Sequence, residues 1–292
     1  MAGKKIASWF LAARPKTLPA AIVPVWSGCL LSWKFQGSVD LWLASLTLVG
    51  AICIQIATNF FNDVIDARKG ADTKDRVGPQ RATISGLLKP VEVYTGAGVM
   101  LMLACLCGYF LSLQRGWPIV AIGVPSLYLS YGYTGGFFPL AYRGVGELFV
   151  ILFFGIIAVS GTVFIQTGIW LSEAFILGVQ IGLLSAVLIA VNNYRDVEED
   201  RVANKRTLAV RFGRRAAKIM ILLMTVTPAI LLLFMEGNIL WLIGSFLLAV
   251  AFIIAELKML KSDGCEPRLL GLSALHLILF VVLQNVGMTI GN

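Results

Sequence analysis

Residues 41–72 read LWLASLTLVGAICIQIATNFFNDVIDARKGAD. The run from Leu41 to Phe61 is mostly apolar and long enough to cross a hydrocarbon core of about 30 Å as a helix. Polar side chains near hydrocarbon are costly unless they serve one another, an ion or a water-filled cavity. Helical spacings of three and four residues put a polar cluster on one face: Asn59, Asn62, Asp63 and Asp66. The stretch therefore predicts a membrane helix whose end can reach a hard cation or its waters.

A second polar stretch also follows an apolar run, and it reads NNYRDVEED over residues 192–200. Asn192, Asp196 and Asp200 are four residues apart, which predicts that they share a helix face. The pattern Asn-x-x-x-Asp-Val, which begins at Asn59, begins again at Asn192 and forms a weak internal repeat. Two carboxylate faces at two helix ends could hold a ligand with several negative charges through divalent cations.

The composition is that of an integral membrane protein. Of the 292 residues, 58% are hydrophobic and 14% are charged, and the mean hydropathy is +0.83. Soluble domains are typically about 45–50% apolar and about a quarter charged. The five cysteines lie mostly inside apolar runs, and the single histidine, His276, does too. A haem site or a histidine-rich metal site is therefore not expected.

Nine apolar runs predict nine membrane-spanning helices in a single domain over residues 1–292. The expected spans are about 18–33, 41–61, 91–113, 117–133, 144–167, 169–191, 217–234, 238–257 and 269–288. With this layout, all of the 24 Lys and Arg except Lys34 and Arg115 fall on one side. The positive-inside rule then predicts a cytoplasmic N-terminus and cytoplasmic Asp-rich loops. The net charge of +8 is mostly a topology signal rather than a sign of nucleic-acid binding.

The chemistry of the polar stretches indicates a magnesium–diphosphate site. Mg²⁺ takes one or two carboxylates, several waters and phosphate oxygens, and Lys and Arg side chains complete such a clamp. The two loops carry cations at Arg68, Lys69, Lys74, Arg76, Arg81, Lys205, Arg206 and Arg211. No glycine-rich Walker loop is present, so a nucleoside triphosphate is not the obvious ligand. A diphosphate at the membrane face with an apolar tail fits better, which describes a polyprenyl diphosphate. The alternative is that these are ordinary loops with solvated charges.

The motif Asn62-Asp63-x-x-Asp66, with the later Asp196-x-x-x-Asp200, resembles the two Asp-rich motifs of the UbiA superfamily of membrane aromatic prenyltransferases. Finer motifs resemble the branch that prenylates 1,4-dihydroxy-2-naphthoate: RPKTLPA (14–20), KGAD (69–72), DRVGP (75–79), YTGG (133–136), GVGE (144–147), NNYRD (192–196) and KRTLAVR (205–211). The resemblance implies a nine-helix bundle around a central cavity in a bacterial inner membrane. It also implies Mg²⁺-dependent transfer of a polyprenyl chain to a bicyclic aromatic acid with loss of carbon dioxide, giving a demethylmenaquinone-type product.

The resemblance implies that Asn62, Asp66, Asn192, Asp196 and Asp200 are metal and diphosphate ligands, and charge and position predict the other roles. The expected metal ligands are Asn62, Asp63, Asp66, Asn192, Asp196 and Asp200, with helix-end capping as the alternative, most of all for Asp63. Lys205 and Arg206 are expected at the diphosphate. Arg14 and Lys16 are expected at the acceptor carboxylate or the diphosphate, or else they snorkel to the interface. The expected substrate-binding residues are Asn59, Arg68, Lys69, Arg76, Arg81, Tyr131, Tyr133 and Arg195.

One position departs from the superfamily pattern. Many members have an acid where this chain has Gly70, and Asp72 is the nearest replacement. Asp72 could be a metal ligand, an acceptor-binding group or the base. Two other functions stay open: a sister enzyme acting on another acceptor (phylloquinone-type phytyl transfer, 4-hydroxybenzoate or homogentisate), and a secondary transporter.

Overall fold

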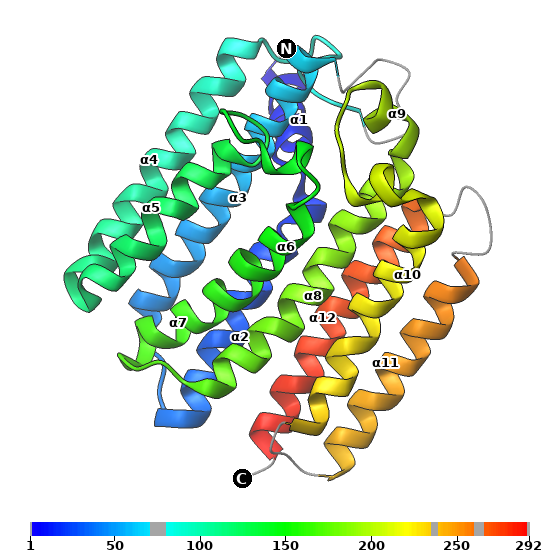
Figure 1. Cartoon of the computed structure of the whole chain (residues 1–292). Coiled ribbons are helices and arrows are strands. Elements are labelled where there is room, and N and C mark those ends of the chain that lie inside the picture. The colour runs from blue at the N-terminus through cyan, green and yellow to red at the C-terminus, as the bar shows by residue number, and fades with distance from the viewer. Residues whose placement is uncertain (1, 71–79, 235–238, 260–265, 291–292) are drawn as a thin grey trace. The chain divides into compact units, whose positions relative to one another are not determined.

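The structure, a computed structural model, describes residues 2–70, 80–234, 239–259 and 266–290 (Figure 1). In this part of the chain every regular element is helical, so the prediction of an all-α protein is confirmed. The elements are α1 (Ala2–Ala13), η1 (Pro15–Thr17), α2 (Pro19–Gln36), α3 (Leu41–Lys69), α4 (Pro90–Arg115), α5 (Trp117–Gly132), η2 (Leu140–Tyr142), α6 (Gly146–Val150), the π-helix η3 (Ile151–Ile157), α7 (Ala158–Thr167), α8 (Ser172–Arg195), α9 (Val197–Val202), α10 (Leu208–Leu231), η4 (Leu232–Phe234), α11 (Ile239–Met259) and α12 (Glu266–Ile290).

Each of the nine predicted apolar runs falls on helix, but the count of nine membrane spans is not confirmed. Among the described residues, six helices are long and apolar enough to cross a membrane. A seventh span results if α1 and η1 are counted with α2 as one broken span. Helix α5 has only 16 residues, which is short against the roughly 20 that a span needs. The long apolar helices identify an integral membrane protein.

Local sequence signals set the ends of several helices. The Asp40 carboxylate accepts hydrogen bonds from the backbone N–H groups of Trp42 (2.9 Å) and Leu43 (3.0 Å) and so caps the start of α3. Pro90 begins α4, where a missing N–H costs nothing. Gly116 ends α4 with φ +74°, a backbone conformation that favours glycine.

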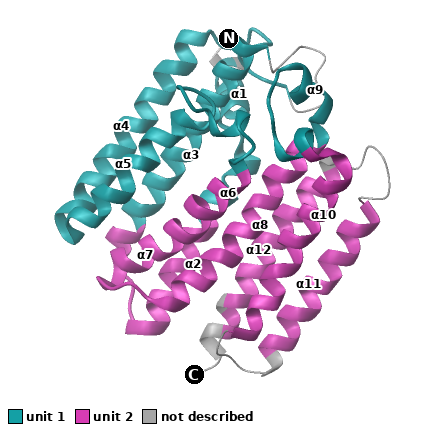
Figure 2. Cartoon of the chain, in the orientation of Figure 1, with its two compact units in different colours: residues 1–22, 45–146, 195–211 teal, residues 23–44, 147–194, 212–292 magenta. Residues whose placement is uncertain are grey.

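The chain divides into two compact units, coloured separately in Figure 2. Unit 1 comprises residues 1–22, 45–146 and 195–211, and unit 2 comprises residues 23–44, 147–194 and 212–292. In unit 1, α4 packs against α5. Its buried apolar side chains are Ala12, Ala57, Phe60, Phe61, Val64, Ile65, Ala82, Leu88, Val93 and Ala97. This core holds the polar end of α3 in place, which prepares the site described below.

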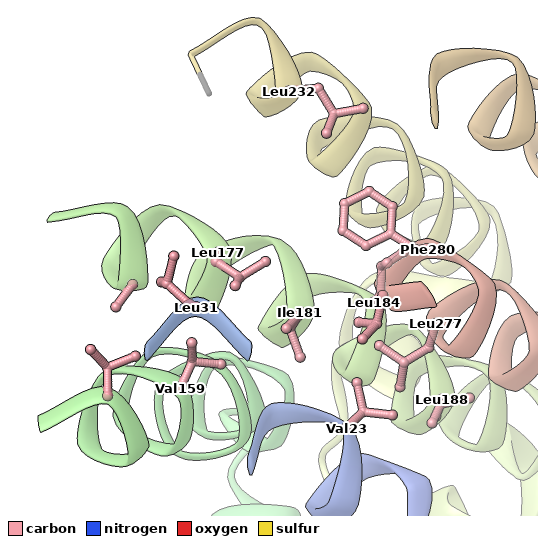
Figure 3. Close-up of a cluster of buried hydrophobic side chains, with 13 residues drawn as sticks. Val23, Leu31, Val159, Leu177, Ile181, Leu184, Leu188, Leu232, Leu277 and Phe280 are labelled. Carbon is pink, nitrogen blue, oxygen red and sulfur yellow. The ribbon is translucent and has the colours of Figure 1, made fainter. Parts of the chain in front are cut away.

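Unit 2 has its own core, built from α2, α7, α8, η4 and α12 (Figure 3). Leu177, Ile181, Leu184 and Leu188 follow one face of α8 at helical spacing. Helices α11 and α12 pack together in this unit. Helix α10 contains one break, because Gly213 has φ +80° and ψ 169°.

A close backbone approach in unit 2 depends on three glycines. Gly155 lies in η3, and Gly178 and Gly182 lie one turn apart on α8. A Cβ atom on Gly182 would lie 2.6 Å from the Ile151 carbonyl oxygen, and one on Gly155 would lie 2.2 Å from the Gly178 carbonyl oxygen. The two segments can therefore approach this closely only without side chains at these positions.

Candidate functional site

Helix α3 continues through the whole polar motif to Lys69, which confirms the helical interpretation of residues 59–69. The Asp66 carboxylate is buried and accepts a 2.8 Å hydrogen bond from the Tyr142 hydroxyl. The Asn62 side-chain oxygen accepts a hydrogen bond from the Thr134 hydroxyl. The Lys69 ammonium donates to the Thr134 carbonyl at 2.7 Å. The end of α3 is thus fastened to the segment that follows α5.

Two other members of the α3 motif, Asp63 and Asn59, form hydrogen bonds with other segments of unit 1. Asp63 is only 1% exposed, and its two carboxylate oxygens accept from the N–H groups of Ala82 (3.0 Å) and Thr83 (2.8 Å). The Asn59 amide donates to the Ala13 carbonyl at 2.8 Å and to the Thr17 hydroxyl at 3.0 Å. Asp63 therefore stabilises the backbone of the segment before α4, and Asn59 links α3 to α1 and η1 by hydrogen bonds.

The second acidic stretch differs from its prediction, because it is not one continuous helix. Helix α8 ends at Arg195, Asp196 has φ −90° and ψ 15°, and α9 begins at Val197. Arg195 pairs with the Asp196 carboxylate through its Nε (2.5 Å) and its terminal nitrogen (2.8 Å). The Lys205 ammonium lies 3.4 Å from the Asp200 carboxylate. A shared helix face is lost, but Asp196 and Asp200 stay one turn apart through the hydrogen bond from the Asp200 N–H to the Asp196 carbonyl.

The carboxylates of the two acidic stretches act on each other electrostatically. Burial of Asp200 raises the pKa of its carboxyl from 3.8 to about 6. The neighbouring charges of Asp196 and Asp66 also raise this pKa, and Lys205 lowers it. One oxygen of Asp200, Oδ2, is buried and has no hydrogen-bond partner among the residues that the structure describes. A buried, unpaired carboxylate oxygen close to further negative charge is a position that a cation would stabilise.

Tyr142 is a member of the site that the sequence prediction missed. Its hydroxyl donates to Asp66. The Lys69 ammonium lies 4.0 Å from the centre of its ring, and the Lys205 ammonium lies 5.8 Å from it. Thr134, which was noted only as part of a motif, contacts both Asn62 and Lys69. The only signal in the sequence was a short polar interruption between two apolar runs.

The UbiA prenyltransferase family matches residues 21–276 of the chain. The chain belongs to this family. It is 40% identical over 211 residues to the 1,4-dihydroxy-2-naphthoate octaprenyltransferase of Mycobacterium tuberculosis, a match that covers 71% of this chain and 70% of that protein. It is 34% identical over 220 residues to the protein of the same description from Haemophilus influenzae, covering 73% and 71%. The predicted family is confirmed.

Two solved structures of UbiA homologues share the fold. One, from Archaeoglobus fulgidus, is bound to DMAPP and Mg²⁺, and it aligns with a TM-score of 0.68 over 97% of this chain and 99% of that one. The apo structure of a homologue from Aeropyrum pernix K1 aligns with a TM-score of 0.69 over 94% and 98%. The sequence identities are 14% and 16%, so these matches show the fold alone.

The donor set of this UbiA protein fits a hard cation such as Mg²⁺. Carboxylate and amide oxygens from α3 and α9 are the ligand types that Mg²⁺ uses, and the unpaired oxygen of Asp200 gives it a place to bind. Within the described residues, no three His, Cys, Asp or Glu side chains gather tightly enough to hold a metal alone. A cation here would need waters or phosphate oxygens to complete its shell, as Mg²⁺ commonly does.

The remaining predicted site residues are spread over the fold. Asn192 lies in unit 2, where its amide donates to the Leu188 carbonyl at 3.0 Å. Arg14 is half-buried with φ 51°, and Lys16 is exposed. Asp72 and Arg76 fall outside the described residues.

The other predicted substrate-binding residues lie in unit 1, where Arg68 is exposed and within 3.5 Å of the Tyr94 hydroxyl. The Tyr131 ring meets Phe61 edge-on at 5.3 Å. Tyr133 and Arg81 are half-buried, and Arg206 is exposed.

Proposed function

We propose that this UbiA protein transfers a polyprenyl chain from polyprenyl diphosphate to 1,4-dihydroxy-2-naphthoate in a Mg²⁺-dependent reaction. The acceptor loses carbon dioxide, and the product is a demethylmenaquinone-type quinone. The observation that carries the proposal is the electrostatic coupling of the buried Asp200 carboxyl to Asp196 and Asp66, with Lys69 and Lys205 beside Tyr142. The naphthoate octaprenyltransferases among its relatives support the choice of acceptor.

The metal-binding role falls to Asp66 and Asp200 first, with Asp196 and Asn62 as further ligands. Asn192 is proposed as a ligand from the sequence pattern alone. When bound, Mg²⁺ draws charge from the diphosphate and eases ionisation of the allylic C–O bond. Asp63 has both oxygens bound to backbone N–H groups, so we assign it to holding residues 82 and 83. Arg195 holds the Asp196 carboxylate in place.

The substrate-binding roles follow from charge and position. Lys69 and Lys205 lie near the Tyr142 ring and balance the charge of the diphosphate, and Arg206 directly follows Lys205 in the sequence. Tyr131 and Tyr133 line the space for the aromatic acceptor and stabilise the allylic cation through their ring faces. Arg14 and Lys16 bind the carboxylate of the acceptor. Asp72 is the candidate base, and Arg68, Arg76 and Arg81 neutralise charge around the diphosphate.

The protein resides in the bacterial plasma membrane with its N-terminus and both acidic segments on the cytoplasmic side. The distribution of Lys and Arg supports this orientation. Polyprenyl diphosphate suits that location, because its acidic headgroup meets a basic protein face while its polyprenyl tail stays in lipid.

The test is an assay of the purified protein in detergent. The enzyme is mixed with 1,4-dihydroxy-2-naphthoate and a labelled allylic diphosphate, with Mg²⁺ or with EDTA. Prenylated naphthoquinone and released carbon dioxide, both lost with EDTA, are the expected products. Turnover with 4-hydroxybenzoate or homogentisate alone would reassign the acceptor. Sodium-dependent uptake into proteoliposomes without covalent change would replace the enzyme with a transporter.

A further inference from the structure

Tyr142 connects the end of α3 to the segment that follows α9 in unit 1. Its hydroxyl contacts α3 through Asp66 at 2.8 Å. Its backbone carbonyl accepts a 3.1 Å hydrogen bond from the N–H of Arg206, which follows α9. The same residue therefore contacts the first acidic stretch with its side chain and the segment after α9 with its backbone.

The segment that carries Tyr142, residues 133–144, is fixed at both ends. The Ala141 N–H donates to the Tyr133 carbonyl at 2.8 Å. The Arg211 guanidinium donates to the Arg143 carbonyl at 2.8 Å. Gly144 has φ +68°, and a Cβ atom there would lie 2.6 Å from the Arg206 carbonyl oxygen. Tyr142 is therefore presented to Asp66 from a rigid support.

The ring of Tyr142 lies near two cations, Lys69 at the end of α3 and Lys205 after α9. The Lys69 ammonium, on α3, lies 4.0 Å from the ring centre. The Lys205 ammonium, in the segment after α9, lies 5.8 Å from the same ring centre. Two ammonium groups beside one ring repel each other, and the negative face of the aromatic ring offsets part of that repulsion. The ring thus favours both lysines beside it.

We propose that Tyr142 is a positioning residue that orients the Asp66 carboxylate for metal binding and holds Lys69 and Lys205 together for the diphosphate. The hydroxyl occupies Oδ1 of Asp66 and fixes the carboxylate plane, which leaves Oδ2 for a cation. Groups that orient a metal ligand in this way typically change metal affinity 10–100-fold when they are removed. The inference rests on the proposed function only in that Asp66 binds the metal.

The experiment separates the hydroxyl from the ring. Mn²⁺ binding to the purified protein is followed by electron paramagnetic resonance in the absence of substrates, and binding of inorganic diphosphate is followed by calorimetry. Y142F removes only the hydroxyl and is expected to bind Mn²⁺ about tenfold more weakly, with diphosphate binding in metal-free buffer unchanged. Y142L removes the ring as well and is expected to weaken diphosphate binding too. The control is Y109F, at an exposed tyrosine of α4.

Three results would overturn the proposal. The first is Mn²⁺ binding by Y142F equal to wild type, and the second is an equal loss in Y109F. The third is a fall in the Tm of Y142F that saturating Mn²⁺ does not reverse, which would make the hydroxyl merely structural. Failure of the naphthoate assay with wild-type protein would count against the proposed function alone, since Mn²⁺ binding is measured without substrate.

Discussion

Asp200 carries a clear pH dependence at the scale of a single residue. Its carboxyl has a pKa of about 6 because burial and two nearby carboxylates disfavour its charged form. A metal must displace the proton, so Mg²⁺ binding releases one proton below pH 6 and none well above it. We expect the Mg²⁺ activation constant to be flat above about pH 7 and to rise toward tenfold per pH unit below about pH 6. Initial rates between pH 5 and 8 at varied Mg²⁺ would measure it.

The control for this titration is Asp200→Asn, which lacks the titrating group. Its residual Mg²⁺ affinity should be weaker and should not change with pH over the same range. A wild-type activation constant that stays level through pH 6 would contradict the assignment of Asp200 as a ligand.

Gly144 offers a second test at the residue scale, because it combines backbone strain with a steric contact. Gly144→Ala places a side chain at φ +68° and 2.6 Å from the Arg206 carbonyl. Gly86→Ala meets the same φ of +68° with nothing within 4 Å. Both variants carry about 1–2 kcal/mol of left-handed strain, but only the first displaces Arg206. We expect a lower Tm for both and a marked loss of prenyl transfer only for Gly144→Ala. Equal activity in the two would show that the contact is unimportant.

The sequence predicted the acidic residues of the site but not the role of each. Asn62, Asp66, Asp196 and Asp200 stand out because polar side chains beside apolar runs are costly. Asp63 has the same signal, although its oxygens are bound to backbone N–H groups. The sequence did not identify Tyr142 as a site residue, because its contact with Asp66 spans 76 residues and depends on a loop conformation that periodicity does not describe.

Helix–helix contact in unit 2 is the feature to test at the scale of elements. Gly182→Ala would place its Cβ atom 2.6 Å from the Ile151 carbonyl oxygen and 2.9 Å from the Ile151 Cα. Backbone atoms cannot move aside as a flexible side chain can, so overpacking should cost about 1–3 kcal/mol. Gly108→Ala on α4 meets nothing within 4 Å and should be neutral or slightly stabilising, because alanine favours helix. Thermal unfolding in detergent would measure both, and equal Tm values would refute the close approach.

The boundaries of elements were predicted unevenly. Apolar runs located every long helix, since a membrane span has a strong signal of length and hydropathy. The sequence placed Asn192, Asp196 and Asp200 on one helix, whereas the helix ends at Arg195 and restarts at Val197. Hydrophobic periodicity does not report where a helix breaks. The π-helix at 151–157, which approaches Gly178 and Gly182 of α8 closely, was likewise not predicted.

Orientation in the membrane is the prediction that concerns the whole molecule. In a variant without its native cysteines, we would compare Ser38→Cys, which lies between α2 and α3, with Lys89→Cys, which lies at the start of α4; both positions are exposed. A membrane-impermeant maleimide added to intact cells should label the first variant and should label the second only after permeabilisation. The physical reason is that Lys and Arg concentrate on the side of the acidic segments. The reverse labelling pattern would invert the proposed topology.

The hydrogen bond between Tyr142 and Asp66 also has a consequence for biosynthesis. Its two partners are 76 residues apart, and a ribosome adds about 5–20 residues per second. Asp66 therefore emerges from the ribosome several seconds before the tyrosine that it will bind, and Lys205 emerges later still. During that interval the acidic end of α3 must remain in contact with water or with the insertion machinery. The contacts that Tyr142 makes with Asp66 and Lys205 therefore form late in synthesis, after the first helices of the chain have been made.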